Sequence, residues 1–463
     1  MKLSCDVQLP ASKSESNRAL MIAAYGGFAL DFQNLSESKD TQVLMQALIG
    51  LPFIDSFRFF SACHSSPLGE RNLCREKLLN DIKSQQKCID IADCGTAARF
   101  MTTYLACHDG EWLLTGNERM KQRPIRPLVD ALLLLGADIQ YVEKPGFLPL
   151  LIHGKPISGG KVAIDMSQSS QFVSSLLMAA PMWPQGLELE LQGNLNSIPY
   201  LDMTLQMLCH FFAQVERRGH LIQVWPQPYR PVAFTVSADW SAASYWYELA
   251  ALSEECEIRL RSLKYLAVNR HTSPATLVMS TDAGGSASMG DHSSLQGDSI
   301  IAEWMKPFGV TTTQESDSLI LTKSSSYPQP LSFDCYNNPD LFPTLAATCA
   351  GLRREAHFSG IANLHFKESD RVEAMKLELA KIGVDLVKIN DNELFLKPAQ
   401  SLPFFEPSSP LLFASHGDHR IVMALAPLSL KLGSIVFDHP EVVAKSYPDF
   451  WEKMGKMLPI LKV

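Results

Sequence analysis

The sequence predicts an α/β protein built from about six similar units, each of roughly 80 residues. Two observations lead to this prediction: two kinds of helix alternate along the chain, and short strand-like runs lie between them. Each unit pairs two helices with several strands, and such a chain most simply forms layers of helices and sheets. Chance similarity among alanine-rich helices is the alternative, but the alternation continues through all 463 residues.

Helices of the first kind begin with small, polar or charged residues and continue with apolar residues, many of them alanine. Ordinary N-capping by Ser, Thr or Asp explains any one polar start. Six such starts, several of them basic, favour anion binding at helix N-termini, where backbone N–H groups lack partners. We expect these helices to begin near Ser12, Asp93, Ser167, Ser237, Asn337 and Gly417.

Helices of the second kind are amphipathic and often end in Gly followed by a small apolar residue. We expect them at residues 41–51, 126–137, 201–215, 299–310, 369–384 and 448–457. Short alternating or β-branched runs predict strands at 161–164, 187–191, 234–236, 319–322 and 435–438. An irregular stretch at 53–87 interrupts the first unit, and we expect an insertion there with a short charged helix at 75–83.

Composition and charge limit the function classes. The net charge of −8 argues against a nucleic-acid or anionic-membrane partner, and no apolar run reaches membrane-spanning length. Residues 1–10 lack the basic and apolar regions of a signal peptide. Ten scattered cysteines without a CxxC pair fit free thiols better than disulfides or a zinc site. We expect a cytoplasmic monomer with small-molecule ligands, no bound metal, and no nucleic-acid or membrane partner.

Residues 367–371, Lys-Glu-Ser-Asp-Arg, carry four charges at the start of a predicted helix. Lys367 and Arg371 are one helical step apart, so we expect them to meet one ligand while Glu368 points elsewhere. Two cations at a helix N-terminus with a carboxylate beside them suit phosphate binding and proton transfer. A solvent-exposed charged face is the alternative. The chain contains no P-loop and no GxGxxG motif.

Ten stretches from end to end of the chain together form one pattern: SKSESNRAL, DCGTAAR, TGNERMKQRPIRPLVDAL, SSQFVSSLLMAAP, SIPYLDMTL, GDSIIAEWMKPFG, NPDLFPTLA, KESDRVEAM, GDHRIVMALA and KSYPDFWEKM. In this order they resemble the enolpyruvyl transferase family. The resemblance implies two similar domains, each of three βαβαββ repeats in an inverse α/β barrel-like arrangement, with the active site in the interdomain cleft. It places crossovers near 12–13 and 236–237, so that one domain comprises 1–12 and 237–463 and the other 13–236.

The resemblance implies transfer of the enolpyruvyl group of phosphoenolpyruvate to the 5-hydroxyl of shikimate 3-phosphate, a step toward chorismate and aromatic amino acids. Phosphate is released, and no cofactor is needed. Catalysis is assigned to Asp340 as the base near the hydroxyl, Glu368 at the methylene proton, and Lys13, with His419 in support. The implied shikimate 3-phosphate ligands are Lys13, Ser14, Arg18, Ser169, Ser170, Gln171, Ser197, Tyr200, Asp340, Asn363 and Lys367. The implied phosphoenolpyruvate ligands are Lys13, Gly95, Arg123, Gln171, Arg371, Arg420 and Lys445.

Some positions depart from the family pattern, and two other functions stay open. Asp93 stands where the family commonly has Asn, and Phe100 where one branch has Pro; both bear on sensitivity to the family's inhibitor, glyphosate. A sister enzyme acts on UDP-N-acetylglucosamine. It usually has Asn where Ser14 stands and a reactive Cys in the basic loop at 119–124, where this chain has Met-Lys-Gln at 120–122. The second alternative function is that of a binding or regulatory relative that has lost catalysis, although each catalytic position holds a competent residue.

Overall fold

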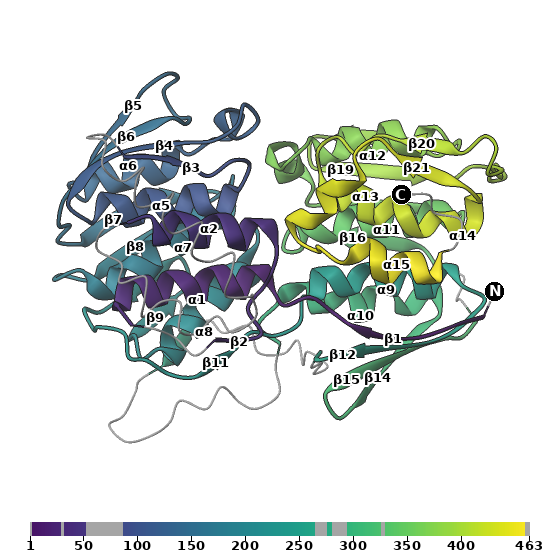
Figure 1. The fold of residues 1–463 in the computed structure, drawn as a ribbon, viewed down its shortest axis with the longest axis horizontal. Helices are drawn as coiled ribbons and strands as arrows, with labels where there is room; N and C mark the ends of the chain where they lie inside the picture. Colours follow the sequence, from purple (N-terminus) through teal and green to yellow (C-terminus); the bar gives the residue numbers. More distant parts are fainter. Residues whose placement is uncertain are drawn as a thin grey trace, which may run out of the picture.

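The computed structural model describes residues 2–28, 32–51, 87–263, 276–279, 294–325 and 329–458. Figure 1 shows two halves of similar architecture side by side, each with helices packed against small sheets. The expected insertion at 53–87, apart from Lys87, and its helix at 75–83 lie outside the described residues. Within the described ranges, no helix combines the length and the apolar character needed to cross a bilayer.

One complete unit shows how the chain is built. Its parallel strands β3 and β4 are joined by a crossover through α5, as parallel pairing requires, and β6 pairs antiparallel with both β4 and β5. This βαβαββ order confirms the repeat that the family resemblance implies. The unit consists of β3 (Lys87–Asp90), α5 (Gly95–Ala106), β4 (Gly110–Thr115), α6 (Arg126–Leu134), β5 (Asp138–Tyr141) and β6 (Leu150–Gly154).

The same order and pairing recur in two further units. One consists of β7 (Gly160–Asp165), α7 (Ser170–Ala179), β8 (Leu187–Gln192), α8 (Ile198–His210), β9 (Val215–Arg218) and β10 (Leu221–Val224), with β13 (Thr276–Met279) beside β9. The other consists of β16 (Leu331–Asp334), α11 (Phe342–Gly351), β17 (Ala356–Ser359), α12 (Arg371–Ala380), β18 (Asp385–Asn390) and β19 (Glu393–Lys397).

Strand exchange between distant parts of the chain completes two more units. Strand β1 (Lys2–Gln8) pairs in parallel with β12 (Glu255–Arg261), and β11 (Phe234–Thr235) pairs in parallel with β2 (Phe32–Gln33). The chain therefore passes twice between the halves, and the two passages touch where the Ser12 N–H donates to the Ser237 carbonyl at 2.8 Å. The other elements of these units are α1 (Lys13–Gly26), α2 (Lys39–Ile49), α9 (Trp240–Leu252), α10 (Ile301–Trp304), β14 (Val310–Glu315) and β15 (Ser318–Lys323).

Each half has its own hydrophobic core. One core contains buried residues between Ala11 and Val236, and the other contains Leu3, Val7 and Leu9 with buried residues between 238 and 458. The last unit of the second half contains β20 (Leu411–Phe413), α13 (His419–Leu425), α14 (Ser429–Leu432), β21 (Ile435–Phe437) and α15 (Phe450–Met457). The predicted α/β fold of two similar halves is confirmed.

The predicted helices of the first kind are confirmed as α1, α5, α7, α9, α11 and α13, and five of the six begin at a side-chain N-cap. The capping residues are Ser12, Cys94, Ser169, Asp239 and Asp418. N-capping therefore accounts for the polar residue at these five helix starts. The polar residues that follow each cap are still available to bind a ligand. Among helices of the second kind, the prediction at 299–310 is wrong in extent: α10 has only four residues, because Pro307 and Gly309 (φ 83°) do not continue a helix.

Candidate functional site

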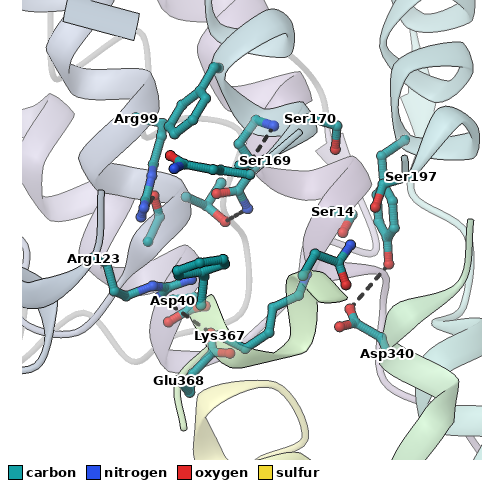
Figure 2. Close-up of a pocket in the computed structure, with 18 of the residues that line it drawn as sticks. Ser14, Asp40, Arg99, Arg123, Ser169, Ser170, Ser197, Asp340, Lys367 and Glu368 are labelled. Atoms are coloured by element: carbon teal, nitrogen blue, oxygen red, sulfur yellow. Dashed lines mark hydrogen bonds and ion pairs between the residues drawn. The ribbon is translucent and has the colours of Figure 1, made fainter. Parts of the chain in front are cut away.

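A polar pocket lies between the two halves and is lined from both (Figure 2). The first half contributes residues at or just before the N-termini of α1, α5, α7 and α8. The second half contributes the short helices η5 (Pro339–Leu341) and η6 (Ala362–Phe366) together with the starts of α12 and α13. Because helix N-termini expose unpaired backbone N–H groups, their convergence makes this pocket suited to anions.

The pocket brings together every residue that the sequence assigned to the site except Lys445. Its lining includes Lys13, Ser14, Arg18, Gly95, Arg123, Ser169, Ser170, Gln171, Ser197, Tyr200, Asp340, Asn363, Lys367, Glu368, Arg371, His419 and Arg420. Lys445, at the end of η8 (Pro440–Lys445), is buried behind the pocket wall against Asp40, which does line it.

The segment 367–371 differs from its prediction. Helix α12 begins at Arg371, with the Asp370 carboxylate accepting from the Glu373 N–H at 3.1 Å, so Lys367 and Glu368 precede the helix. Asp is a strong N-cap, and it starts the helix later than the charge pattern suggested. The expectation that Glu368 points away from Arg371 is wrong, because Arg371 Nη2 donates to Glu368 Oε2 at 2.9 Å.

Asp340 accepts hydrogen bonds from both halves of the molecule. Arg371 Nη1 donates to Oδ1 at 2.6 Å and Arg420 Nη2 to Oδ2 at 2.7 Å. The Tyr200 hydroxyl donates to Oδ2 at 3.2 Å. Burial alone would raise the pKa of Asp340, but Arg420, Lys367 and Arg371 hold it well below its ordinary value. Asp340 is therefore ionised and is the carboxylate partner of both arginines.

Glu368 lies between two arginines from opposite halves. Its Oε1 is 3.5 Å from Arg123 Nη1, and Oε2 accepts from Arg371. Burial would raise the pKa of Glu368, yet Arg123 and Arg371 hold it well below its ordinary range. Figure 2 shows Glu368 and Lys367 extending toward Arg123 and Asp40 of the other half. The pocket therefore contains two carboxylates that cations surround, the composition expected where anionic ligands meet proton-transfer groups.

The wall nearer α1, α7 and α8 is rich in hydroxyl and amide groups. Arg18 is buried there, donating to Thr204 Oγ1 at 2.8 Å and Ser174 Oγ at 3.1 Å, and burial lowers its pKa to about 10. Gln171 Nε2 donates to Thr96 Oγ1 at 3.0 Å. Ser197 adopts the left-handed backbone conformation (φ 58°), which is uncommon for a residue other than glycine.

His419 and Asn363 present polar atoms without hydrogen-bond partners among the described residues. Both ring nitrogens of His419 and the Asn363 side-chain oxygen are buried in this state. Burial, with Lys13 nearby, lowers the pKa of His419 to about 3, so its ring is neutral at physiological pH. Buried polar groups normally have partners, and two orphans on one pocket wall suggest that a ligand supplies them.

Several residues at or beside the pocket had no role assigned from the sequence, and three of them make contacts that shape it. Asp40 accepts from Lys13 at 2.9 Å and from Lys445 at 2.8 Å, and Arg99 lies beside Gly95. Arg119 crosses between the halves, donating to the carbonyls of Lys367 and Glu368, each at 2.8 Å. Asp40 follows a helix start and Arg119 lies in the basic loop, so local signals existed, but their partners are far away in the sequence.

Comparison with known proteins gives consistent results. The family described as EPSP synthase (3-phosphoshikimate 1-carboxyvinyltransferase) matches residues 1–272 and 289–454. A 3-phosphoshikimate 1-carboxyvinyltransferase from Bacteroides fragilis is 37% identical over 98% of this chain and 95% of the relative. One from Mannheimia succiniciproducens is 31% identical over 98% and 96%. An EPSP synthase structure from Acinetobacter baumannii superposes with a TM-score of 0.67 at 19% identity, covering 99% and 96%, and shows the shared fold.

Proposed function

Because the chain belongs to the EPSP synthase (3-phosphoshikimate 1-carboxyvinyltransferase) family, we propose that it joins phosphoenolpyruvate to shikimate 3-phosphate. The enzyme transfers the enolpyruvyl group to the 5-hydroxyl, forming 5-enolpyruvylshikimate 3-phosphate and phosphate. The observation that carries this proposal is the convergence of two carboxylates, Asp340 and Glu368, with cations from both halves in one pocket. The family resemblance predicted from the sequence is confirmed by the same comparisons.

Shikimate 3-phosphate binds on the wall formed by α1, α7 and α8. Its phosphate lies near Arg18 and the serines, and its ring packs beside Tyr200 with the 5-hydroxyl toward Asp340. The hydroxyl groups, the Gln171 amide and the orphan Asn363 oxygen match the several hydroxyls of the ring. The proposed ligands are Lys13, Ser14, Arg18, Ser169, Ser170, Gln171, Ser197, Tyr200, Asp340, Asn363 and Lys367.

Phosphoenolpyruvate binds between Gly95 and the starts of α12 and α13. Its carboxylate takes the place of carboxylate partners on Arg371 and Arg420, where a planar guanidinium can bind two oxygens. Its phosphate lies toward Lys13, Gly95, Arg123 and Gln171, with Lys445 behind them. The absence of a side chain at Gly95 lets the phosphate approach the N-terminus of α5.

The carboxylates move the protons. Glu368, in its protonated form, gives a proton to the methylene carbon of phosphoenolpyruvate. The 5-hydroxyl oxygen attacks the adjacent carbon as Asp340 accepts its proton, and a tetrahedral intermediate forms. The carbon–oxygen bond to phosphate then breaks, Glu368 takes a proton back from the methyl group, and Lys13 supplies a proton to the departing phosphate. The enolpyruvyl ether and phosphate are the products.

Ligand charge prepares these groups. Arg123 and Arg371 hold the pKa of Glu368 low, a state in which it cannot act as an acid. When the anionic groups of phosphoenolpyruvate share those arginines, the carboxyl has less positive charge around it and its pKa rises. Substrate binding therefore brings Glu368 toward the protonated state only when there is a substrate to protonate.

We further propose the domain division and the setting of the enzyme. The domains are 1–12 with 237–463, and 13–236; the touching passages at Ser12 and Ser237 and the two separate cores support this division. The enzyme acts as a monomer in the cytoplasm and binds no nucleic acid, as the net charge of −8 favours.

A coupled phosphate-release assay tests the function. With phosphoenolpyruvate and shikimate 3-phosphate, we expect phosphate release that depends on both compounds. UDP-N-acetylglucosamine in place of shikimate 3-phosphate should give none, because Ser14 and the basic loop lack the features of that sister enzyme. Phosphate release with UDP-N-acetylglucosamine but not with shikimate 3-phosphate would reverse the assignment of the acceptor. No phosphate release with either acceptor would indicate a catalytically silent relative.

A further inference from the structure

Lys445 is held by three oxygen atoms that lie close around its ammonium group. Its Nζ lies 2.8 Å from Asp40 Oδ1, 2.9 Å from Asp93 Oδ2 and 3.1 Å from the Asp93 carbonyl oxygen. The contacts with Asp40 and with the Asp93 carbonyl are hydrogen bonds, and the contact with the Asp93 carboxylate is an ion pair. An anion in the neighbouring pocket therefore competes with these oxygens for Lys445.

The two lysines and two aspartates that are in direct contact here carry equal and opposite charges. Lys13 and Lys445 provide two positive charges, and Asp40, which binds both, and Asp93, which binds Lys445, provide two negative charges. A lysine pair compensated in this way attracts a phosphate weakly until one carboxylate withdraws. Which carboxylate withdraws decides how tightly the anion binds.

Asp93 is the partner that can leave. The Asp40 side chain is 3% exposed and both of its oxygens hold lysines, so its removal would bury two unpaired cations. The Asp93 side chain is 29% exposed and lines a second cavity of about 580 Å³, which also borders Asn117 and Arg119. A rotation of Asp93 into that cavity would leave its carboxylate near donors and remove its negative charge from Lys445.

We propose that Asp93 is an internal competitor of the substrate anion for Lys445 and thereby sets the affinity for phosphoenolpyruvate. Part of the binding energy of the substrate goes into displacing this carboxylate, so the affinity is lower than the cations alone would give. The identity of the anion rests on the proposed function, whereas the competition itself concerns any phosphate at this position. Asp93 acts through Lys445 and is a specificity-determining residue with no part in proton transfer.

The test is Asp93→Asn, which keeps the size and removes the charge, with Asp93→Ala as a second variant. Calorimetry with inorganic phosphate should show binding about two- to fivefold tighter in both variants, the range of one partly exposed ion pair. The KM for phosphoenolpyruvate should fall by a similar factor, and the dissociation constant of shikimate 3-phosphate should not change. The gain should shrink at high ionic strength, since exposed charges are screened.

Asp109→Asn is the matched control. Asp109 is exposed, and its substitution also removes one negative charge from the first half. Unchanged or weaker phosphate binding in both Asp93 variants, or an equal gain in the control, would overturn the proposal. The two proposals fail separately. An enzyme that makes no enolpyruvyl product refutes the proposed function, while the phosphate calorimetry still decides the role of Asp93.

Discussion

Replacing Gly95 by alanine places a methyl group where two guanidinium groups already lie. A Cβ at this position would be 2.6 Å from Arg123 Nη1 and 2.7 Å from Arg99 Nη1. The backbone does not require glycine, because Gly95 is absent from the positive-φ residues, and alanine favours a helix start. The cost therefore falls on Arg123 and Arg99, which lie beside the proposed phosphate position.

The size of the effect on KM depends on which arginine side chain the new methyl group displaces. Arg99 is buried and donates to the carbonyls of Gly95 and Pro124, both at 3.0 Å, so it resists displacement. Arg123 has the looser contact, 3.5 Å to Glu368, and must retreat by most of an ångström. Weakening one charged hydrogen bond to the substrate phosphate costs about 1.5–3 kcal/mol, which corresponds to about a ten- to hundredfold rise in KM for phosphoenolpyruvate.

The assay measures KM for phosphoenolpyruvate, inhibition by glyphosate and the melting temperature of Gly95→Ala. Glyphosate is longer than phosphoenolpyruvate, so its inhibition constant should rise more than the KM. Gly455→Ala is the control, since it also adds a methyl group to a helix but meets no atom within 4 Å. A KM within twofold of wild type, equal losses for substrate and inhibitor, or a large fall in melting temperature would refute the steric reasoning.

Three further predictions concern other residues. Asp340→Asn and Glu368→Gln should each keep shikimate 3-phosphate binding, measured by calorimetry, and lower kcat by about 10²–10⁴-fold; a near wild-type kcat would remove that residue from proton transfer. Arg119→Lys should lower kcat about tenfold without changing shikimate 3-phosphate binding, because lysine cannot donate in parallel to two carbonyls; unchanged kcat would contradict a positioning role. Burial raises the pKa of Glu15 to about 7 from 4.5, so the folded state loses about 3 kcal/mol as pH rises between these values. The melting temperature of Glu15→Gln relative to wild type should therefore be higher at pH 8 than at pH 5. The same difference at both pH values would argue against a buried, titrating Glu15.

The sequence was sufficient for features that depend on neighbouring residues. The helix starts predicted near Ser12 and Ser237 lie at or within two residues of the observed caps, Ser12 and Asp239, because each capping side chain and the N–H that it accepts from lie three residues apart. The six-unit order followed from helix periodicity alone. The prediction was wrong where two local signals disagreed. The charges at 367–371 suggested a helix start before Asp370, whereas Asp370 caps α12, which begins at Arg371.

Long-range pairing was not visible in the sequence. Asp40 holds Lys13, which is 27 residues away, and Lys445, which is 405 residues away, and no local pattern predicts the second contact. Arg119 reaches carbonyls about 250 positions along the chain. These contacts depend on how the two halves face each other, a property that only the assembled fold determines.

The most direct test of the central claim is ³¹P NMR of the enzyme with phosphoenolpyruvate and shikimate 3-phosphate. We expect the phosphoenolpyruvate resonance to be replaced by that of inorganic phosphate, in an amount equal to a new phosphate monoester resonance from the enolpyruvyl ether of shikimate 3-phosphate. Phosphate without that ether would show hydrolysis instead of transfer. Unchanged spectra with folded enzyme would contradict the account.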